Sequence, residues 1–126
     1  MVFGVVGSRE FTDYSFMKKT LDYYLEIGSI DKIISGGARG ADTLAKKYAM
    51  DNEIPFQEFI AEWEQYGKSA GFIRNEKIVN NIDMLVAFPV KGIENKGTMH
   101  SIRLAQKQNK DVVICEYEFD ETERIG

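Results

Sequence analysis

The feature that most constrains the fold is an alternation of short, continuously apolar runs with longer amphipathic segments. Strands are expected at five such runs, residues 2–6, 32–35, 56–60, 84–88 and 112–115. Runs that are apolar at every position, rather than at every second one, are typical of strands in a sheet covered on both faces. Strands and helices that alternate in this way predict parallel βαβ units with right-handed crossovers.

Helices are expected between the strands, where apolar residues recur at helical spacing. We expect one from the capping residues Thr12 and Asp13 to Ile27, one of about ten residues ending at Met50, one from about 69 to 80 and one from 97 to about 110. Residues 61–67 are expected to form a loop and 116–126 a peripheral tail. The predicted fold is one domain over residues 1–126, a doubly wound, mostly parallel five-stranded α/β sheet with helices on both faces, of the Rossmann-like kind.

Composition and charge narrow the classes of function. With 126 residues, 44% of them hydrophobic, the chain is large enough to form a stable core without disulfide bonds or a structural metal ion. Its net charge of −4 argues against a nucleic-acid backbone as the main ligand, because tracking phosphates needs a surplus of Lys and Arg on one face. A small anion remains compatible, since an acidic protein can contain a local basic pocket.

The scarcity of cysteine and histidine excludes several kinds of site. The single Cys115 cannot form an internal disulfide and is expected at a buried strand position, and the single His100 cannot build a multi-histidine metal site. We expect neither a metal nor an organic cofactor. No apolar run approaches the roughly 20 residues of a membrane span, and the first strand leaves no room for a signal peptide, so we expect a cytoplasmic protein.

The candidate site lies where three loops follow predicted strands. In an open parallel sheet, ligands bind outside the carboxyl ends of the strands. Gly7-Ser8-Arg9 follows the first strand, residues 36–42 follow the second, and the segment from Pro89 to Thr98 follows the fourth. A glycine such as Gly37 can adopt a positive φ and let the backbone approach an anion, and helix N-termini add unpaired N–H groups. With Arg9 and Arg39 nearby, these loops predict a phosphate or pyrophosphate site, although neither GxGxxG nor GxxxxGK[ST] is present.

A second group of candidates lies in residues 63–76. Arg74 can present a bidentate fork to a phosphate, and Asn75 can pair with a base edge or a ribose hydroxyl. The alternative is a surface Arg74 that pairs with Glu76 or Glu64. Trp63 and Tyr66 either stack on a base or wedge their loop onto the sheet. For His100, in the first turn of its helix, we expect a structural or solvent-exposed role.

These residues together make up the predicted ligand site. Its members are Gly7, Ser8, Arg9, Gly36, Gly37, Ala38, Arg39, Asp42, Arg74, Asn75, Lys96, Gly97 and Thr98. If the site is catalytic, the acting carboxylate is open among Asp42, Glu76 and Glu10.

The runs Gly7-Ser8-Arg9, residues 35–42, 67–71 with Arg74-Asn75, and 96–98 resemble, in order and over nearly the whole chain, the small proteins of the SLOG superfamily. That superfamily also contains the Lonely-Guy-type phosphoribohydrolases, also known as lysine decarboxylase-like proteins. The resemblance implies a Rossmann-like fold that binds nucleotides or nucleotide-derived signals, often as a homodimer or larger assembly. Carried over by position, it places in the pocket Gly36, Gly37, Arg39, Asp42, Arg74, Gly97 and Thr98.

The chain departs from the phosphoribohydrolases at their catalytic motif. There, Pro-Gly-Gly-x-Gly-Thr-x-x-Glu supplies phosphate binding and the catalytic carboxylate. Here Pro89 and Gly97-Thr98 remain, but the loop between them is longer and Ser101 occupies the glutamate position. Cleavage of an N-ribosidic bond develops oxocarbenium character, which a positioned carboxylate stabilises, so this departure argues against turnover.

We therefore expect a protein that binds a phosphate-bearing, nucleotide-derived small molecule without turnover, as a sensor, carrier or sequestering protein. The ligand classes considered are a nucleotide, an ADP-ribose-like molecule and a cyclic nucleotide. The alternative is a nucleoside 5′-monophosphate phosphoribohydrolase, an N-glycosidase. We expect a homo-oligomer with no membrane partner. Nucleic acid is not expected as a partner, because the net charge opposes it and no basic-aromatic stripe is visible.

Overall fold

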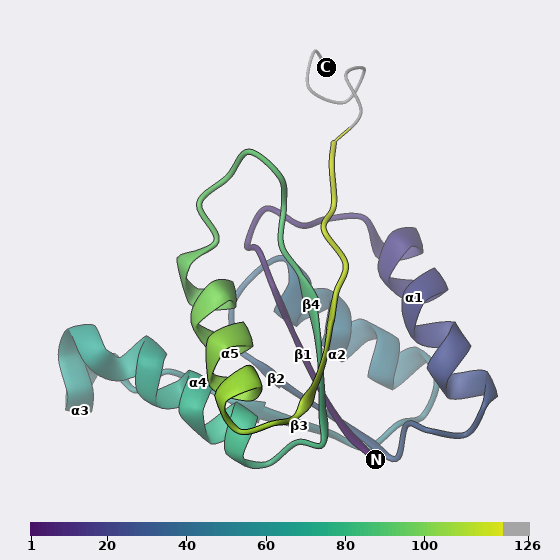
Figure 1. The fold of residues 1–126 in the computed structure, drawn as a ribbon, viewed down its shortest axis with the longest axis horizontal. Helices are drawn as coiled ribbons and strands as arrows, with labels where there is room; N and C mark the ends of the chain where they lie inside the picture. Colours follow the sequence, from purple (N-terminus) through teal and green to yellow (C-terminus); the bar gives the residue numbers. More distant parts are fainter. Residues whose placement is uncertain (120–126) are drawn as a thin grey trace.

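The computed structural model describes residues 1–119, which form a five-stranded sheet between two layers of helices (Figure 1). The strands are β1 (Val2–Gly7), β2 (Lys32–Gly36), β3 (Phe56–Phe59), β4 (Met84–Phe88) and β5 (Asp111–Ile114). The helices are α1 (Tyr14–Glu26), α2 (Ala41–Asp51), α3 (Trp63–Tyr66), α4 (Ala70–Asn80) and α5 (Lys96–Lys107), with a 3₁₀ turn, η1 (Gly67–Ser69), between α3 and α4. No strand boundary differs by more than one residue from the boundary expected from the apolar runs.

The strand order is β3-β2-β1-β4-β5, and every pair of neighbours is parallel. β2 and β3 are added in turn on one side of β1. The chain then crosses over, and β4 and β5 are added on the other side of β1. The predicted doubly wound, Rossmann-like fold is thus confirmed. The order reverses between β1 and β4, and their carboxyl ends are where such sheets leave a crevice.

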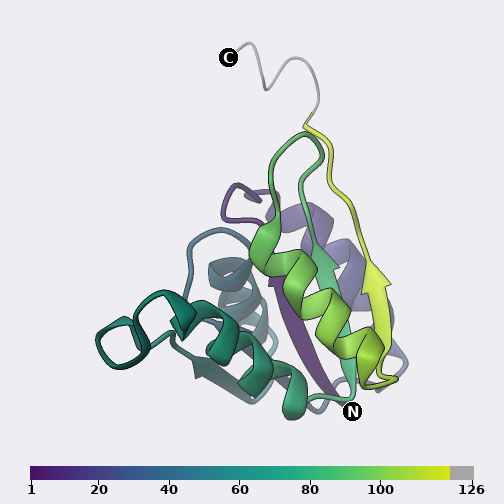
Figure 2. The ribbon, with the colours of Figure 1, turned by 60° about the vertical axis from the view of Figure 1, so that its left-hand side comes forward.

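Each face of the sheet has its own apolar core. On one face, Met17 and Leu21 of α1 and Tyr48 of α2 are fully buried against β1, β2 and β4. On the other face, Ile78 of α4 and Ile102 of α5 are buried with side chains from the same strands. Figure 2 shows α4 and α5 in front of the sheet, with α1 and α2 behind it. Burial on both faces explains why the central strands β1 and β4 contain no polar side chain, whereas the edge strand β3 contains Gln57 and Glu58.

The helix ends follow local capping rules. The Asp13 carboxylate accepts a hydrogen bond from the Phe16 N–H at 3.0 Å, so the predicted cap of the first helix is confirmed. The last helix ends at Lys107, earlier than the expected 110, because Asn109 adopts a positive φ of 56° and the chain turns there. Within residues 1–119, no helix is both long and apolar enough to cross a membrane.

The segment expected as a loop at residues 61–67 instead contains α3, followed by η1. The four-residue α3 ends where Gly67 takes a positive φ of 57°, and it is too short to produce a periodic pattern in the sequence. Figure 1 shows α3 projecting from the body of the protein at the start of α4. We call residues 63–72 the projecting arm.

The C-terminal segment differs in part from the expected peripheral tail. Residues 120–126 lie outside the described residues. Tyr117, however, is only 8% exposed, packs against Phe11 and Phe16, and donates a hydrogen bond from its hydroxyl to Asp13 at 3.0 Å. Its backbone also pairs with the chain just after β4. Cys115, next to the edge strand, is half-buried, and burial raises the pKa of its thiol.

Candidate functional site

A cleft of about 540 Å³ lies at the carboxyl ends of β1, β2 and β4. We call it the main cleft. It brings together every residue of the predicted ligand site except Gly36 and Gly37, namely Gly7, Ser8, Arg9, Ala38, Arg39, Asp42, Arg74, Asn75, Lys96, Gly97 and Thr98. Residues from four separate elements therefore converge here, as expected for loops at the same edge of a parallel sheet.

Ser8 fixes the loop after β1. Its N–H donates to the carbonyl of Phe88 at 3.1 Å, and its own carbonyl accepts from Ala41, the first residue of α2, at 3.2 Å. Its hydroxyl accepts from the N–H of Glu10 at 3.0 Å. Ser8 is buried, and these bonds tie β1 to β4 and to α2. Its role is therefore to hold the loop that carries Arg9.

The glycines at the end of β2 and in the loop after it have roles that differ from those expected. Gly37 does not have a positive φ, so that part of the prediction is wrong; the loop turns at Gly40, with φ +77°. A Cβ on Gly40 would lie 2.5 Å from the carbonyl oxygens of Ser8 and Arg9. Gly36 lies beneath the main cleft, where a Cβ would lie 2.5 Å from Nη1 of Arg74. The absence of a side chain at Gly36 is what allows the Arg74 guanidinium to lie there.

Asn75 holds Arg74 in place. The Nε–H of Arg74 donates to Oδ1 of Asn75 at 3.0 Å, while Nδ2 of Asn75 donates to the carbonyl of Gly97 and lies 3.3 Å from Nδ1 of His100. Asn75 is buried with these bonds made, so it links α4 to α5. Among the described residues Arg74 forms no ion pair, and the alternative of a surface pair with a glutamate is wrong.

Asp42 is a buried carboxyl group beside Arg74. It is 7% exposed, and its Oδ2 accepts from the N–H of Ala38 at 3.2 Å. Burial raises the pKa of Asp42, outweighing the opposing effects of the Arg74 charge and the hydrogen bonds. The hydroxyl of Ser35 lies 3.1 Å from Oδ1 and 2.6 Å from the carbonyl of Val5. Because a hydroxyl has one proton to donate, a proton on Asp42 lets both contacts be hydrogen bonds.

The main cleft is more basic than the chain as a whole. Four basic side chains line it against three carboxyl groups, of which Asp42 is one. Arg39 pairs with Glu10 at 2.8 Å on the exposed rim. Within residues 1–119, neither Arg9 nor Lys96 takes part in an ion pair. The N-terminal residues of α2 and α5 also line the cleft, and neither helix has a side-chain cap.

The remaining candidate residues, Glu10, Glu76, Ser101 and His100, do not all line the main cleft. Glu10 lines the main cleft in its pair with Arg39, whereas Glu76 is exposed on α4 and does not line it. Ser101 is buried, and its hydroxyl donates to the carbonyl of Gly97 at 3.3 Å. His100 is half-buried against Phe72, with ring centroids 4.4 Å apart. Burial lowers the pKa of His100, which favours the neutral ring whose Nδ1 can accept from Asn75.

Sequence reasoning missed part of the lining. The additional residues are Val6, Ile78, Ile93, Glu94, Asn95 and Ser101. Asn95 shapes the loop after β4, because its Nδ2 donates to the carbonyls of Val90 at 2.9 Å and Ile93 at 2.8 Å. An asparagine directly before Lys96-Gly97-Thr98 is a typical helix-start signal, and it could have identified this residue.

A second hollow of about 340 Å³ adjoins the main cleft. We call it the side hollow. It shares Arg9, Ala38, Arg39 and Arg74 with the main cleft and adds Gly37, Ile60, Ala61 and Trp63. Trp63 is 54% exposed, and Tyr66 is also exposed, so neither wedges the segment onto the sheet.

The fold is similar to that of DNA processing protein A from Helicobacter pylori, with a TM-score of 0.65 and 22% sequence identity. The similarity covers 90% of this chain, which spans 64% of the length of that one. At this identity the comparison establishes the fold. That neighbour is described as having a unique single-stranded DNA binding mode.

This comparison corrects the predicted ligand and partner. A small-molecule, nucleotide-derived ligand was expected and nucleic acid was not, whereas the protein that shares the fold binds single-stranded DNA. The prediction failed because it used the charge of the whole chain. The net charge of −4 hides the local excess of basic side chains at the main cleft.

Sequence comparisons show the family. The Gene 61 protein of Mycobacterium phage D29 is 38% identical over 88 residues, which cover 64% of this chain and 68% of that protein. The family described as YspA, cpYpsA-related SLOG matches residues 4–66, the stretch that runs from within β1 to the end of α3 and contains the first two loops of the main cleft. The predicted SLOG resemblance is confirmed, and the chain belongs to the YspA, cpYpsA-related SLOG family.

Proposed function

We propose that this protein binds single-stranded DNA, and that the main cleft holds the phosphodiester backbone. The observation that carries the proposal is the convergence of Arg9, Arg74 and Lys96, which make no ion pair within residues 1–119, at one cleft. Phosphates supply most of the affinity in nucleic-acid binding, and unpaired Lys and Arg side chains are what neutralise them. The single-stranded DNA ligand of the structural neighbour supports the same class of ligand.

Among the basic residues of the cleft, Arg74 is the best placed to contact a phosphate directly. Its Nε–H is already bonded to Asn75, which leaves both Nη groups available for phosphate oxygens. The neighbouring Asn75 is buried, so the guanidinium is held in one orientation before a ligand arrives. Pre-organised donors cost less conformational entropy on binding. Arg9, on the loop after β1, and Lys96, the first residue of α5, also line the cleft and can neutralise further phosphates.

Asp42 makes DNA binding dependent on pH, because burial raises the pKa of its carboxyl group beside the proposed phosphate site. An ionised carboxylate beside a phosphate would repel it, whereas a protonated one does not. A phosphate bound nearby would raise the pKa further, so binding is linked to proton uptake. We therefore expect affinity for DNA to increase as the pH falls toward the pKa of Asp42.

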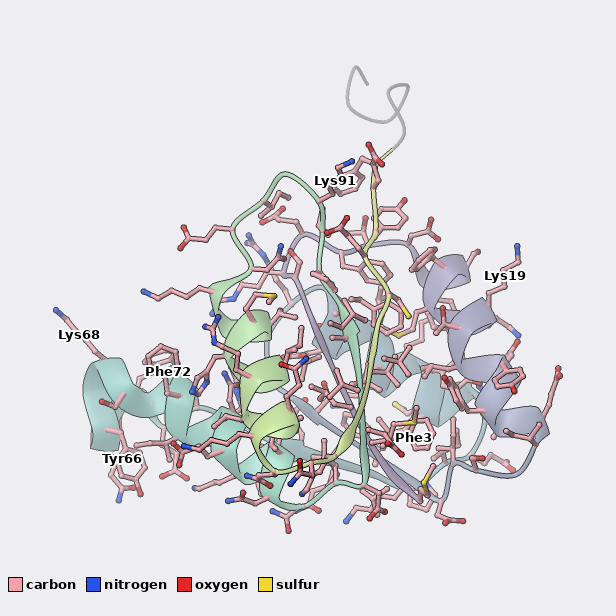
Figure 3. All side chains as sticks on the ribbon, in the orientation of Figure 1. Phe3, Lys19, Tyr66, Lys68, Phe72 and Lys91 are labelled. Carbon is pink, nitrogen blue, oxygen red and sulfur yellow. The ribbon has the colours of Figure 1, made fainter. Side chains whose placement is uncertain are left out.

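The test is fluorescence anisotropy with a labelled oligothymidylate at a series of salt concentrations. For three neutralised phosphates, log K should fall with log salt with a slope of about −2. Arg74→Ala should weaken binding roughly 10- to 150-fold, the range for losing a hydrogen bond to a charged group. Lys19→Ala is the control. Lys19 does not line the cleft and lies on α1, on the side of the molecule away from the projecting arm (Figure 3), and its replacement removes the same charge.

Four results would contradict the proposal. The folded parent protein could fail to bind the oligonucleotide, or Arg74→Ala and Lys19→Ala could bind with equal affinity. Equal affinity for duplex DNA of the same length would remove the preference for a single strand. Comparison with an oligouridylate tests DNA against RNA in the same assay, and tighter binding of the RNA would replace DNA as the ligand.

A further inference from the structure

The side hollow combines an apolar wall with a cationic rim. Ile60, Ala61 and Trp63 form the wall, and Arg9, Arg39 and Arg74 lie on the side shared with the main cleft. The two spaces are therefore continuous. A ligand whose charged part occupies the main cleft can extend an uncharged part into the side hollow.

Large apolar side chains on and beside the projecting arm are left exposed. The aromatic residues Trp63, Tyr66 and Phe72 are all exposed, and so is Ile60. Figure 3 shows Tyr66, Lys68 and Phe72 on this arm, away from the body of the sheet. Trp63 packs beside Gly71, where a Cβ would lie 3.5 Å from its ring. Trp63 is thus held on the arm by α4 and still presents ring surface to solvent.

We propose that the side hollow is a nucleobase subsite, in which an unpaired base stacks on Trp63 while the phosphate next to it is held in the main cleft. This inference rests on the proposed function. Every base has a π-face, so stacking on an indole requires no particular sequence. It requires a base that is free of a duplex, and for that reason the subsite gives the preference for single strands.

Charge favours a nucleotide over an apolar peptide as the occupant. An apolar side chain entering the hollow would leave Arg9 and Arg74 without partners and partly desolvated. A nucleotide brings its own phosphate to these cations. The guanidinium of Arg39, on the rim, can also lie against the face of a base, since guanidinium groups stack on aromatic rings in general.

The test uses the only tryptophan in the chain. Trp63 fluorescence is followed during titration with an oligothymidylate and with an abasic oligomer that has the same number of phosphodiesters. We expect quenching by the oligothymidylate only. The oligothymidylate should also bind about 5- to 150-fold more tightly than the abasic oligomer, which corresponds to one stacked base.

Variants separate stacking from folding. With labelled oligomers, Trp63→Ala should lose the preference for the base-containing strand and bind the abasic oligomer like the parent. Trp63→Phe should retain part of the preference, because a phenyl ring still stacks. Tyr23→Ala, which removes an exposed aromatic ring from α1, is the matched control and should behave like the parent.

The outcomes distinguish this inference from the proposed function. If both oligomers bind with equal affinity and the same salt dependence, the cleft binds backbone and the base subsite is refuted. The same conclusion follows if Trp63→Ala keeps the full preference. If the folded parent binds neither oligomer, the proposed function fails, and the inference fails with it.

Discussion

Replacing Gly36 by alanine should weaken DNA binding and leave the fold intact. The added Cβ would lie 2.5 Å from Nη1 of Arg74 and 2.7 Å from Oδ2 of Asp42. Ordinary contact begins at 3.4 Å, so the guanidinium must move by about 0.9 Å. Such a shift displaces the donors that we assign to a phosphate, and small misplacements of positioned groups have large effects.

The size of the effect follows from losing one charge-assisted contact. That contact contributes about 1.5–3 kcal/mol, or roughly 10- to 150-fold in Kd. The slope of log K against log salt should become shallower by about 0.7, the contribution of one phosphate on a single strand. The free energy of unfolding should fall by at most about 1–3 kcal/mol, the usual cost of overpacking, because one atom in conflict belongs to the buried Asp42 but Gly36 does not have a positive φ.

The assay is anisotropy with a labelled oligothymidylate across salt concentrations, accompanied by urea denaturation followed by circular dichroism. Lys19→Ala is the control, since Lys19 lies on α1 and lines neither the main cleft nor the side hollow. Lys19→Ala should keep the parent affinity and salt slope. If Gly36→Ala binds with the parent affinity and slope, Arg74 does not hold a phosphate in the orientation described.

Three further predictions concern the frame of the site. Gly40→Ala should lower the free energy of unfolding by at least about 1–3 kcal/mol in urea denaturation, because φ is +77° and two carbonyl oxygens lie within 2.5 Å of the new Cβ; a parent-like midpoint would contradict this. Asp42→Asn should stabilise the fold more at pH 8 than at pH 4. The folded pKa is raised, so the parent loses stability as pH rises through it, and a gain independent of pH would refute the raised pKa. Tyr117→Ala should cost about 3–5 kcal/mol and Tyr117→Phe only about 0.5–1.5; equal, small losses would mean that this residue is not part of the core.

The sheet could be predicted from the sequence because its strands are short, are mostly apolar and are separated by helical patterns. The position of the site followed from the same pattern, since loops after β1, β2 and β4 must meet at one edge. Local rules sufficed for the Asp13 cap as well. These features depend on the residue types within a few positions of one another.

The features that were missed depend on contacts between distant residues. Gly37 and Gly40 lie in the same loop, and the sequence alone does not show which of them must lack a side chain. The carbonyl groups of Ser8 and Arg9, which come from a different loop, show that it is Gly40. Tyr117 lies in an acidic segment that suggests a tail, yet its ring fills a space beside Phe11. The ligand class was missed because net charge averages over the whole surface, whereas binding depends on the charge at one cleft.

The central position of β1 has a consequence for how the protein folds. Its two neighbours, β2 and β4, come from separate parts of the chain, and β4 pairs with β1 across about 80 residues. A chain that has completed only β1 to β3 leaves one edge of β1 without a partner and lacks the loop that carries Lys96. The hydrogen bond from Tyr117 to Asp13 closes a separation of 104 residues. Non-local contacts of this kind slow folding, and the cleft is complete only when residues from both halves of the chain are in place.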